Sequence, residues 1–167
     1  MDVVNTFLLI NKKIPSKLLL IGDGPERPEI EAYTRGCEDC AEIKFLGKQE
    51  QMEDILPIAD LFLLTSEYES FGLAALEAMA AEVPVISTNA GGLPEIIIDG
   101  VCGYMSPVGD VEDMTRKALF VLDKNNLPRF KESALKRAKE FDISNILPLY
   151  ENYYHKIMEK TAEKIIS

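Results

Sequence analysis

Five short, nearly unbroken apolar runs limit the fold of this chain more than any other feature of its sequence. The first is stopped by Gly22 and the second by Gly47, and helix-like segments separate all of them. Runs of this kind are typical of strands buried on both faces of a parallel sheet. The expected strands cover residues 17–21, 43–46, 60–65, 84–88 and 103–105.

The segments between these runs alternate with them as helices do in a β-α-β chain. This alternation predicts an α/β fold, a Rossmann-like doubly wound parallel sheet. Ligands of such sheets bind beyond the carboxyl ends of the strands, so the loops that follow the strands are expected to converge on one crevice. The expected helices cover residues 3–13, 26–34, 50–58, 71–81, 94–98, 111–123, 127–140 and 146–164; the loops are 22–25, 47–49, 66–70 and 89–92.

The first helix has no strand before it. Residues 1–167 are therefore expected to be a single domain that starts partway into its fold. No internal repeat or low-complexity tract divides the chain.

Charge and composition exclude several classes of partner. Lys and Arg number 18 against 28 Asp and Glu, a net charge of −10, which argues against a general basic field for nucleic acid or anionic membrane. A local phosphate site stays open, because backbone amides can hold phosphate without net charge. The acidic start and the absence of a long apolar run favour a cytoplasmic protein without signal peptide or membrane span.

Three cysteines do not make a secreted disulfide framework, and reduced thiols are expected. Cys37 and Cys40 are spaced as C-x-x-C, which fits a redox pair, half of a zinc site or two unrelated loop thiols. A closed zinc site needs more ligands, and only Cys102 and His155 remain among cysteines and histidines.

The segment 69–80 carries the clearest chemical signal. Glu69 and Glu77 lie eight positions apart, and Glu77 is the only charge inside an apolar helical run. A helix N-terminus offers amides for phosphate, and carboxylates accept hydrogen bonds from sugar hydroxyls. Two plainer interpretations stay open: Glu77 as a core carboxylate paired with Lys or Arg, and Glu69 as a residue favoured only by the helix dipole.

The motifs that match a known family run through most of the chain. They are Leu20–Glu26, Phe45–Gly47, the E-x7-E pair inside S-F-G-L-x-x-L-E-A-M-A, G-G-L-P-E at 91–95, and Gly100 with Gly103–Tyr104. The chain resembles the C-terminal, donor-binding half of a family 4 (group 1) retaining glycosyltransferase with the GT-B fold. Within that family, residues 45–49 and 66–73 are most similar to the enzymes that join GlcNAc from UDP-GlcNAc to L-malate.

The resemblance implies roles for the 69–77 segment. Glu77 would accept the ribose hydroxyls of a nucleotide sugar, and Glu69, at the catalytic position, would face the hydroxyls of the transferred sugar. The backbone at the helix start would bind the diphosphate, through Ser70, Phe71, Gly72 and Leu73.

The resemblance implies two further loops in donor binding: Gly22 and Gly47–Lys48 would border the base. An ordinary solvated lysine is the other interpretation of Lys48. No metal or other cofactor is implied, because helix amides and basic side chains neutralise the diphosphate in this fold. The partners implied are the nucleotide-sugar donor and an N-terminal acceptor-binding domain.

Two departures from the family pattern matter. The basic Arg and Lys that bind phosphate, and the acceptor domain, belong to sequence upstream of Met1 in the family, so this chain alone is expected not to turn over substrate. Glu82 stands where the family has a helix-ending Gly, which implies modest backbone strain or a different turn.

Two other functions remain compatible with the sequence: a UDP-sugar 2-epimerase-like half, and a non-catalytic nucleotide-binding module. Gly91–Gly92 fits either a structural turn or a ligand-facing loop. Tyr150, Tyr153 and Tyr154 share one helical face, which predicts packing against a core or another domain; if exposed, this face would promote homo-oligomers.

Overall fold

The fold was analysed in a computed structural model that describes residues 1–166, except for the side chains at 160 and 162–166. The strands are β1 (Leu18–Ile21), β2 (Ile43–Gly47), β3 (Phe62–Leu64), β4 (Val85–Thr88) and β5 (Gly103–Ser106). The α-helices are α1 (Asp2–Asn11), α2 (Arg27–Arg35), α3 (Met52–Ile55), α4 (Leu73–Ala80), α5 (Leu93–Ile96), α6 (Val111–Val121), α7 (Leu127–Lys139) and α8 (Ile143–Ile166). Short 3₁₀ turns, η1 (Glu38–Cys40) and η2 (Leu56–Ile58), complete the list. Each expected strand and helix is present, with ends shifted by a few residues.

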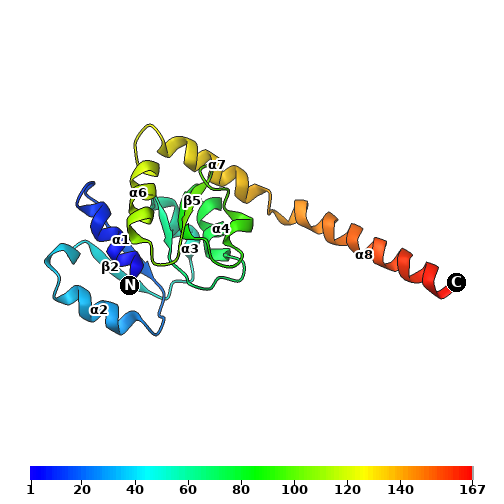
Figure 1. The fold of residues 1–167 in the computed structure, drawn as a ribbon, viewed down its shortest axis with the longest axis horizontal. Helices are drawn as coiled ribbons and strands as arrows, with labels where there is room; N and C mark the ends of the chain where they lie inside the picture. Colours follow the sequence, from blue (N-terminus) through cyan, green and yellow to red (C-terminus); the bar gives the residue numbers. More distant parts are fainter. Residues whose placement is uncertain (167) are drawn as a thin grey trace.

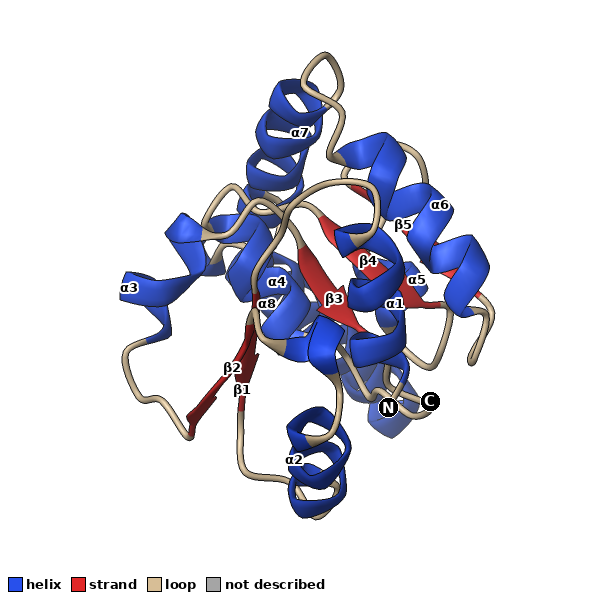
Figure 2. Ribbon diagram, turned by 90° about the vertical axis from the view of Figure 1, so that its left-hand side faces the viewer, coloured by secondary structure: helices blue, strands red, loops and turns tan. Residues whose placement is uncertain are grey.

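The strands are parallel, as predicted, but they form two sheets. β1 pairs with β2, whereas β3, β4 and β5 pair in that order. Figure 2 shows the β1–β2 pair set apart from the other three strands. Within the described residues, β1 pairs only with β2 and β3 only with β4, so the other edge of each strand has no strand beside it.

Both faces of the larger sheet are covered, which is the arrangement expected of a doubly wound fold. Along β4, Val85 packs in a cluster with α4, α5 and α7, and the next residue, Ile86, packs in a second cluster with α6. All four residues of β4 are buried. Alternation of side chains across one strand thus builds a core on each side of the sheet.

Helix α1 contacts both sheets. Val4 and Phe7 pack against Leu18 of β1 and Ile43 of β2, whereas Ile10 joins the cluster of β4 and α6. One short amphipathic helix therefore links the small sheet to the large one.

The turn after α4 confirms the expected strain at Glu82. This residue has φ 63°, and among the described residues no other non-glycine has positive φ. The left-handed conformation is the one a helix-ending glycine adopts most easily.

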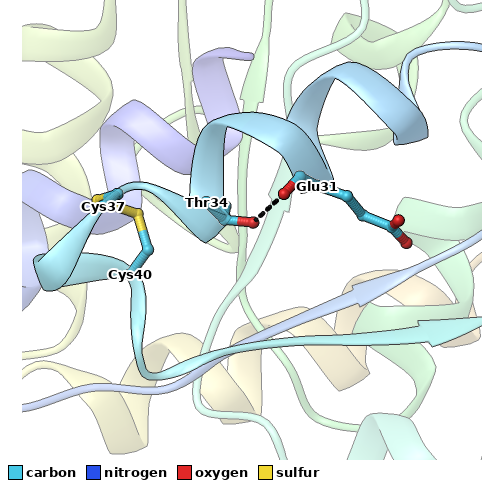
Figure 3. The surroundings of a disulfide bond; sticks show 4 residues. All are labelled: Glu31, Thr34, Cys37 and Cys40. Atoms are coloured by element: carbon cyan, nitrogen blue, oxygen red, sulfur yellow. Dashed lines mark hydrogen bonds between the residues drawn. A yellow bond between two sulfur atoms is a disulfide. The ribbon is translucent and has the colours of Figure 1, made fainter.

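The cysteine expectation was wrong. Cys37 and Cys40 form a disulfide across the turn between α2 and β2, with Cα atoms 5.3 Å apart, and Cys102 is free and buried. Figure 3 shows the bond directly after the end of α2, where the Thr34 hydroxyl donates to the Glu31 carbonyl at 3.2 Å. The two positions meet because η1 brings residues three apart to one side of the turn.

The last helix, α8, leaves the body of the molecule and projects away from it (Figure 1). Tyr150, Tyr153 and Tyr154 are exposed, so packing of this face against a core within the chain was a wrong expectation. None of the helices in the described region has the length and apolarity needed to cross a membrane.

Candidate functional site

The start of α4 places a glycine where no side chain would fit. Gly72, the residue before α4, has φ 95°, and a Cβ there would lie 2.7 Å from Leu93 Cδ2. Its amide donates to Glu69 Oε1 at 3.2 Å. The Glu69 carboxylate therefore accepts a hydrogen bond from one of the amides that a helix N-terminus presents to an anion.

The Gly91–Gly92 turn packs directly beneath this loop. The Gly92 amide donates to the Glu69 carbonyl at 2.9 Å, and a Cβ on Gly92 would lie 2.5 Å from the Ser70 carbonyl oxygen. Of the two interpretations of these glycines, the structure supports the packing role, because the turn holds the loop from below.

Glu77 does not lie where its sequence context placed it. It is exposed, on the side of α4 that lines an open pocket of about 290 Å³ facing α7. α4 turns Ala75, Ala78 and Met79 to the core and half-buries Leu76 against it, whereas Leu73, Ala74 and Ala80 are exposed. Of the interpretations of Glu77, the core carboxylate is therefore wrong, because the residue is exposed.

The pocket beside Glu77 is mostly apolar, with charged groups at its rim. Apart from Glu77 its charged lining residues are Lys139 and Asp142. The apolar lining comes from both helices and the segment after α7: Leu73, Leu76, Ala80, Leu135, Ala138 and Phe141. Such a hollow offers space beside a carboxylate for a partly apolar ligand.

The loops after β1 and β2 meet each other. The Gly22 amide donates to the Gly47 carbonyl at 2.9 Å, and Lys48 follows in an exposed position. The expected residues thus form two groups, one of Gly22, Gly47 and Lys48 and one of Glu69–Leu73 with Glu77. In the described part of the chain no hydrogen bond or ion pair joins the two groups, which lie at the carboxyl ends of different sheets.

Arg137, which contacts the supports of the site, was not predicted from the sequence. On α7, its guanidinium donates to the carbonyls of Glu95 and Ile96 and stacks 4.7 Å from the Phe141 ring centre. Phe141 in turn meets Phe71 edge to face at 6.1 Å. In the sequence, Arg137 is one of three basic residues near the end of a predicted helix, with Lys136 and Lys139. Nothing in that pattern distinguishes its role from theirs.

The described residues contain no group of three or more His, Cys, Asp or Glu placed to hold a metal ion. His155 is exposed on α8. Burial raises the pKa of the Cys102 thiol, which makes this cysteine a poor nucleophile at neutral pH.

Comparison with known proteins gives one consistent family. The family model "Glycosyl transferases group 1" matches residues 3–139. A relative from Bacillus anthracis, N-acetyl-alpha-D-glucosaminyl L-malate synthase, is 38% identical over 159 residues, which cover 94% of this chain and 42% of the relative.

Two solved structures share the fold. The C-terminal domain of a group 1 glycosyl transferase (LpcC) from Francisella tularensis aligns with TM-score 0.74 and 25% identity, over 84% of this chain and 77% of that one. The pneumococcal O-GlcNAc transferase GtfA, in complex with UDP and GlcNAc, aligns with TM-score 0.82 and 20% identity, over 94% of this chain and 33% of that one. With its α/β fold, its parallel strands and a family match over most of its length, this chain belongs to the group 1 glycosyl transferases.

Proposed function

We propose that this chain is the donor-binding half of a retaining glycosyltransferase that moves GlcNAc from a UDP-sugar to a small acceptor such as L-malate. The observation that carries the donor assignment is the start of α4, where the Gly72 amide already holds one carboxylate, Glu69, and a second, Glu77, lies further along the same helix. The sugar and acceptor rest on the relative from B. anthracis, whose name states both. The pneumococcal enzyme, solved with UDP and GlcNAc, supports the nucleotide through its shared fold.

In this proposal the diphosphate binds at the start of α4. The amides of Phe71, Gly72 and Leu73 and the positive end of the helix dipole offset its charge. The Gly72 amide leaves Glu69 Oε1 as the diphosphate arrives, and the freed carboxylate then accepts hydrogen bonds from the transferred sugar. Gly72 allows this close approach because it has no Cβ.

In this proposal the nucleoside contacts Glu77 through its ribose and the loops after β1 and β2 through its base. Glu77, exposed on α4, accepts the ribose hydroxyls beside the pocket of α4 and α7. Gly22 and Gly47, which are hydrogen-bonded to each other, and the exposed Lys48 border the base. Glu69 and Glu77 therefore bind different parts of one donor.

The chemical step needs no protein nucleophile. The sugar–phosphate bond breaks while the acceptor oxygen bonds to the same carbon from the same face. The acceptor proton passes to the departing diphosphate. The protein contributes positioning and stabilises the charge that develops on the diphosphate.

Polypeptide beyond this chain would complete the enzyme. The chain spans 42% of the length of the B. anthracis relative. The Met1 amino group lies 3.6 Å from Glu26, so α1 begins at the carboxyl edge of β1. A parallel strand that precedes α1 and lies between β1 and β3 would complete a right-handed crossover and the strand order common to dinucleotide-binding folds.

Hydrogen exchange tests for such a strand. The Leu18 and Phe62 amides donate toward β2 and β4, so the next amides, those of Leu19 and Leu63, point to the opposite edges. A strand between β1 and β3 is expected to accept hydrogen bonds from these two amides and to slow their exchange.

Titration with UDP and then UDP-GlcNAc, by calorimetry and by amide chemical shifts, tests donor binding directly. Saturable binding with shifts at residues 69–77 supports the proposal, and Glu77→Ala is expected to abolish it. Glu132→Ala, an exposed glutamate on α7, is the matched control. Unchanged affinity in Glu77→Ala would overturn the ribose assignment.

A further inference from the structure

Arg137 closes the end of a helix that supports the candidate site. Its side chain is 20% exposed, with Nε 2.9 Å from the Ile96 carbonyl oxygen and Nη2 2.6 Å from that of Glu95. These are among the last carbonyls of α5, which lack partners inside the helix. A guanidinium fork can serve both at once, whereas a lysine ammonium is a single point charge.

Helix α5 is the floor of the Glu69–Leu73 loop. Its first turn is tied to the loop by the bond from the Gly92 amide to the Glu69 carbonyl. Leu93 and Ile96 are fully buried and fill the space beneath Gly72 so closely that a Cβ there would meet both side chains. A shift of α5 must therefore move the loop.

Arg137 also contacts the same loop indirectly through the ring of Phe141. The Arg137 guanidinium lies over the Phe141 ring at 4.7 Å, and Phe141 meets Phe71 at 6.1 Å with an interplanar angle of 76°. Edge-to-face rings and stacked cations are both favourable geometries. Arg137 thus touches both supports of the loop, the floor below and the ring beside it.

We propose that Arg137 is a positioning residue that fixes the amides of Phe71, Gly72 and Leu73 for the donor diphosphate. The inference rests on the proposed function for the identity of the ligand, whereas the positioning itself concerns contacts within this chain. Arg137 acts through α5 and Phe141: its Nε and Nη2 donate to the Ile96 and Glu95 carbonyls, and its Nη1 donates to Glu140.

The test compares Arg137→Ala and Arg137→Lys with Arg129→Ala. Arg129 is a matched control, because it lies on the same helix and stacks 4.6 Å from the Phe130 ring at the other end of α7. Phe141→Leu removes the ring contacts with Arg137 and Phe71 and keeps an apolar side chain in the pocket lining. Each variant is measured well below its unfolding temperature, for UDP affinity by calorimetry and for exchange of the Gly92 and Gly72 amides without ligand.

Arg137→Ala is expected to weaken UDP binding roughly tenfold or more and to speed exchange at the Gly92 amide, since small misplacements of binding groups are costly. For Arg137→Lys, both UDP affinity and Gly92 exchange are expected to lie between those of the wild type and Arg137→Ala. Phe141→Leu is expected to weaken UDP binding through the Phe71 contact and to leave Gly92 exchange unchanged. Arg129→Ala is expected to match the wild type in both measurements. A folded Arg137→Ala with wild-type exchange at Gly92 and wild-type UDP affinity would overturn the proposal.

Two results separate this inference from the proposed function. If the wild type binds no UDP, the donor assignment fails, and the exchange rates at Gly92 and Gly72 still decide whether Arg137 positions the loop. If Arg137→Ala does not fold, Arg137→Lys and Phe141→Leu decide the same question, and wild-type exchange and affinity in both would overturn it.

Discussion

At the residue scale, the candidate site depends on backbone packed against backbone. The loop at Glu69–Ser70 and the turn at Gly91–Gly92 approach so closely that a single added methyl group would enter the space of a carbonyl. Interiors packed at this density have little room to relax. The geometry of the loop is therefore set by glycines outside it as much as by its own residues.

Gly92→Ala should destabilise the chain by about 2 kcal/mol, because its Cβ would lie 2.5 Å from the Ser70 carbonyl oxygen. The free energy of unfolding in urea measures this loss. Gly24→Ala is the control, since a Cβ at Gly24 meets nothing within 4 Å. Equal effects of the two substitutions would show that the contact at Gly92 is unimportant.

Glu82→Gly should stabilise the chain by about 1 kcal/mol, because a left-handed residue with a Cβ is strained and glycine is not. The φ of 63° at Glu82 is the basis for this expectation. A higher urea midpoint with an unchanged slope is the expected result. Glu82→Ala keeps the Cβ and should give no such gain; an equal gain there would instead assign the effect to the lost charge.

At the element scale, Asp113 ties the start of α6 to the end of β5. Its Oδ2 accepts from the Ser106 hydroxyl at 2.8 Å and lies 2.6 Å from Lys117 Nζ, which also donates to the Met105 carbonyl. The hydrogen bond from Lys117, helped by that from Ser106, lowers the pKa of Asp113. The carboxylate is thus one of the fixed points that hold a helix against the sheet.

The lowered pKa of Asp113 predicts a pH dependence. A depressed folded-state pKa contributes stability that is present above the unfolded value, about 3.9, and lost as the pH falls below it. Asp113→Asn should therefore be less stable than the wild type at pH 7 and lose less stability between neutral pH and pH 3. Urea unfolding across this range measures the difference. For Asp39→Asn, at an exposed residue, the free energy of unfolding should change with pH as it does in the wild type. The same pH dependence in Asp113→Asn would contradict the prediction.

At the scale of the whole molecule, the chain has a packed body and a projecting helix. From Leu147 to Glu159 every residue of α8 is exposed, including Tyr150, Tyr153 and Tyr154. Exposed aromatic rings on one helical face are typical of surfaces that another domain or another copy covers. The stability of the body should owe little to this helix.

Removal of residues 147–167 should change the unfolding temperature by no more than a few degrees, about what 1 kcal/mol is worth in a domain of this size. It should also lower any self-association, because the exposed aromatic face is gone. Calorimetric scans and sedimentation of the two lengths test both parts. A large fall in the unfolding temperature would show that α8 packs on the body.

Local patterns of the sequence predict local structure well. Nearly unbroken apolar runs predicted the five strands. Glu82, at a position where the family has a helix-ending glycine, was expected to be strained, and it has the positive φ that glycine adopts most easily. Both depend on interactions among near neighbours in the chain. The family and its fold followed from motifs for the same reason, since each motif is a short loop with fixed geometry.

Features that depend on distant residues were not predictable. The exposure of Glu77 depends on where α7 lies, and Arg137 contacts carbonyls 41 and 42 positions earlier in the chain. The division of the sheet depends on which strand edges meet, and a strand's own residues do not specify this. Hydrophobic periodicity carries no information about any of these pairings.

The division of the strands into two sheets has a consequence for the order of folding. Each paired strand is joined to its partner by the segment between them, so every pairing closes a short loop. Short loop closures are fast, and among residues 1–166 no strand pairing crosses from one sheet to the other. The β1–β2 unit and the β3–β4–β5 unit can therefore form in parallel, and the docking of α1 on both becomes the step that commits the chain to one native structure.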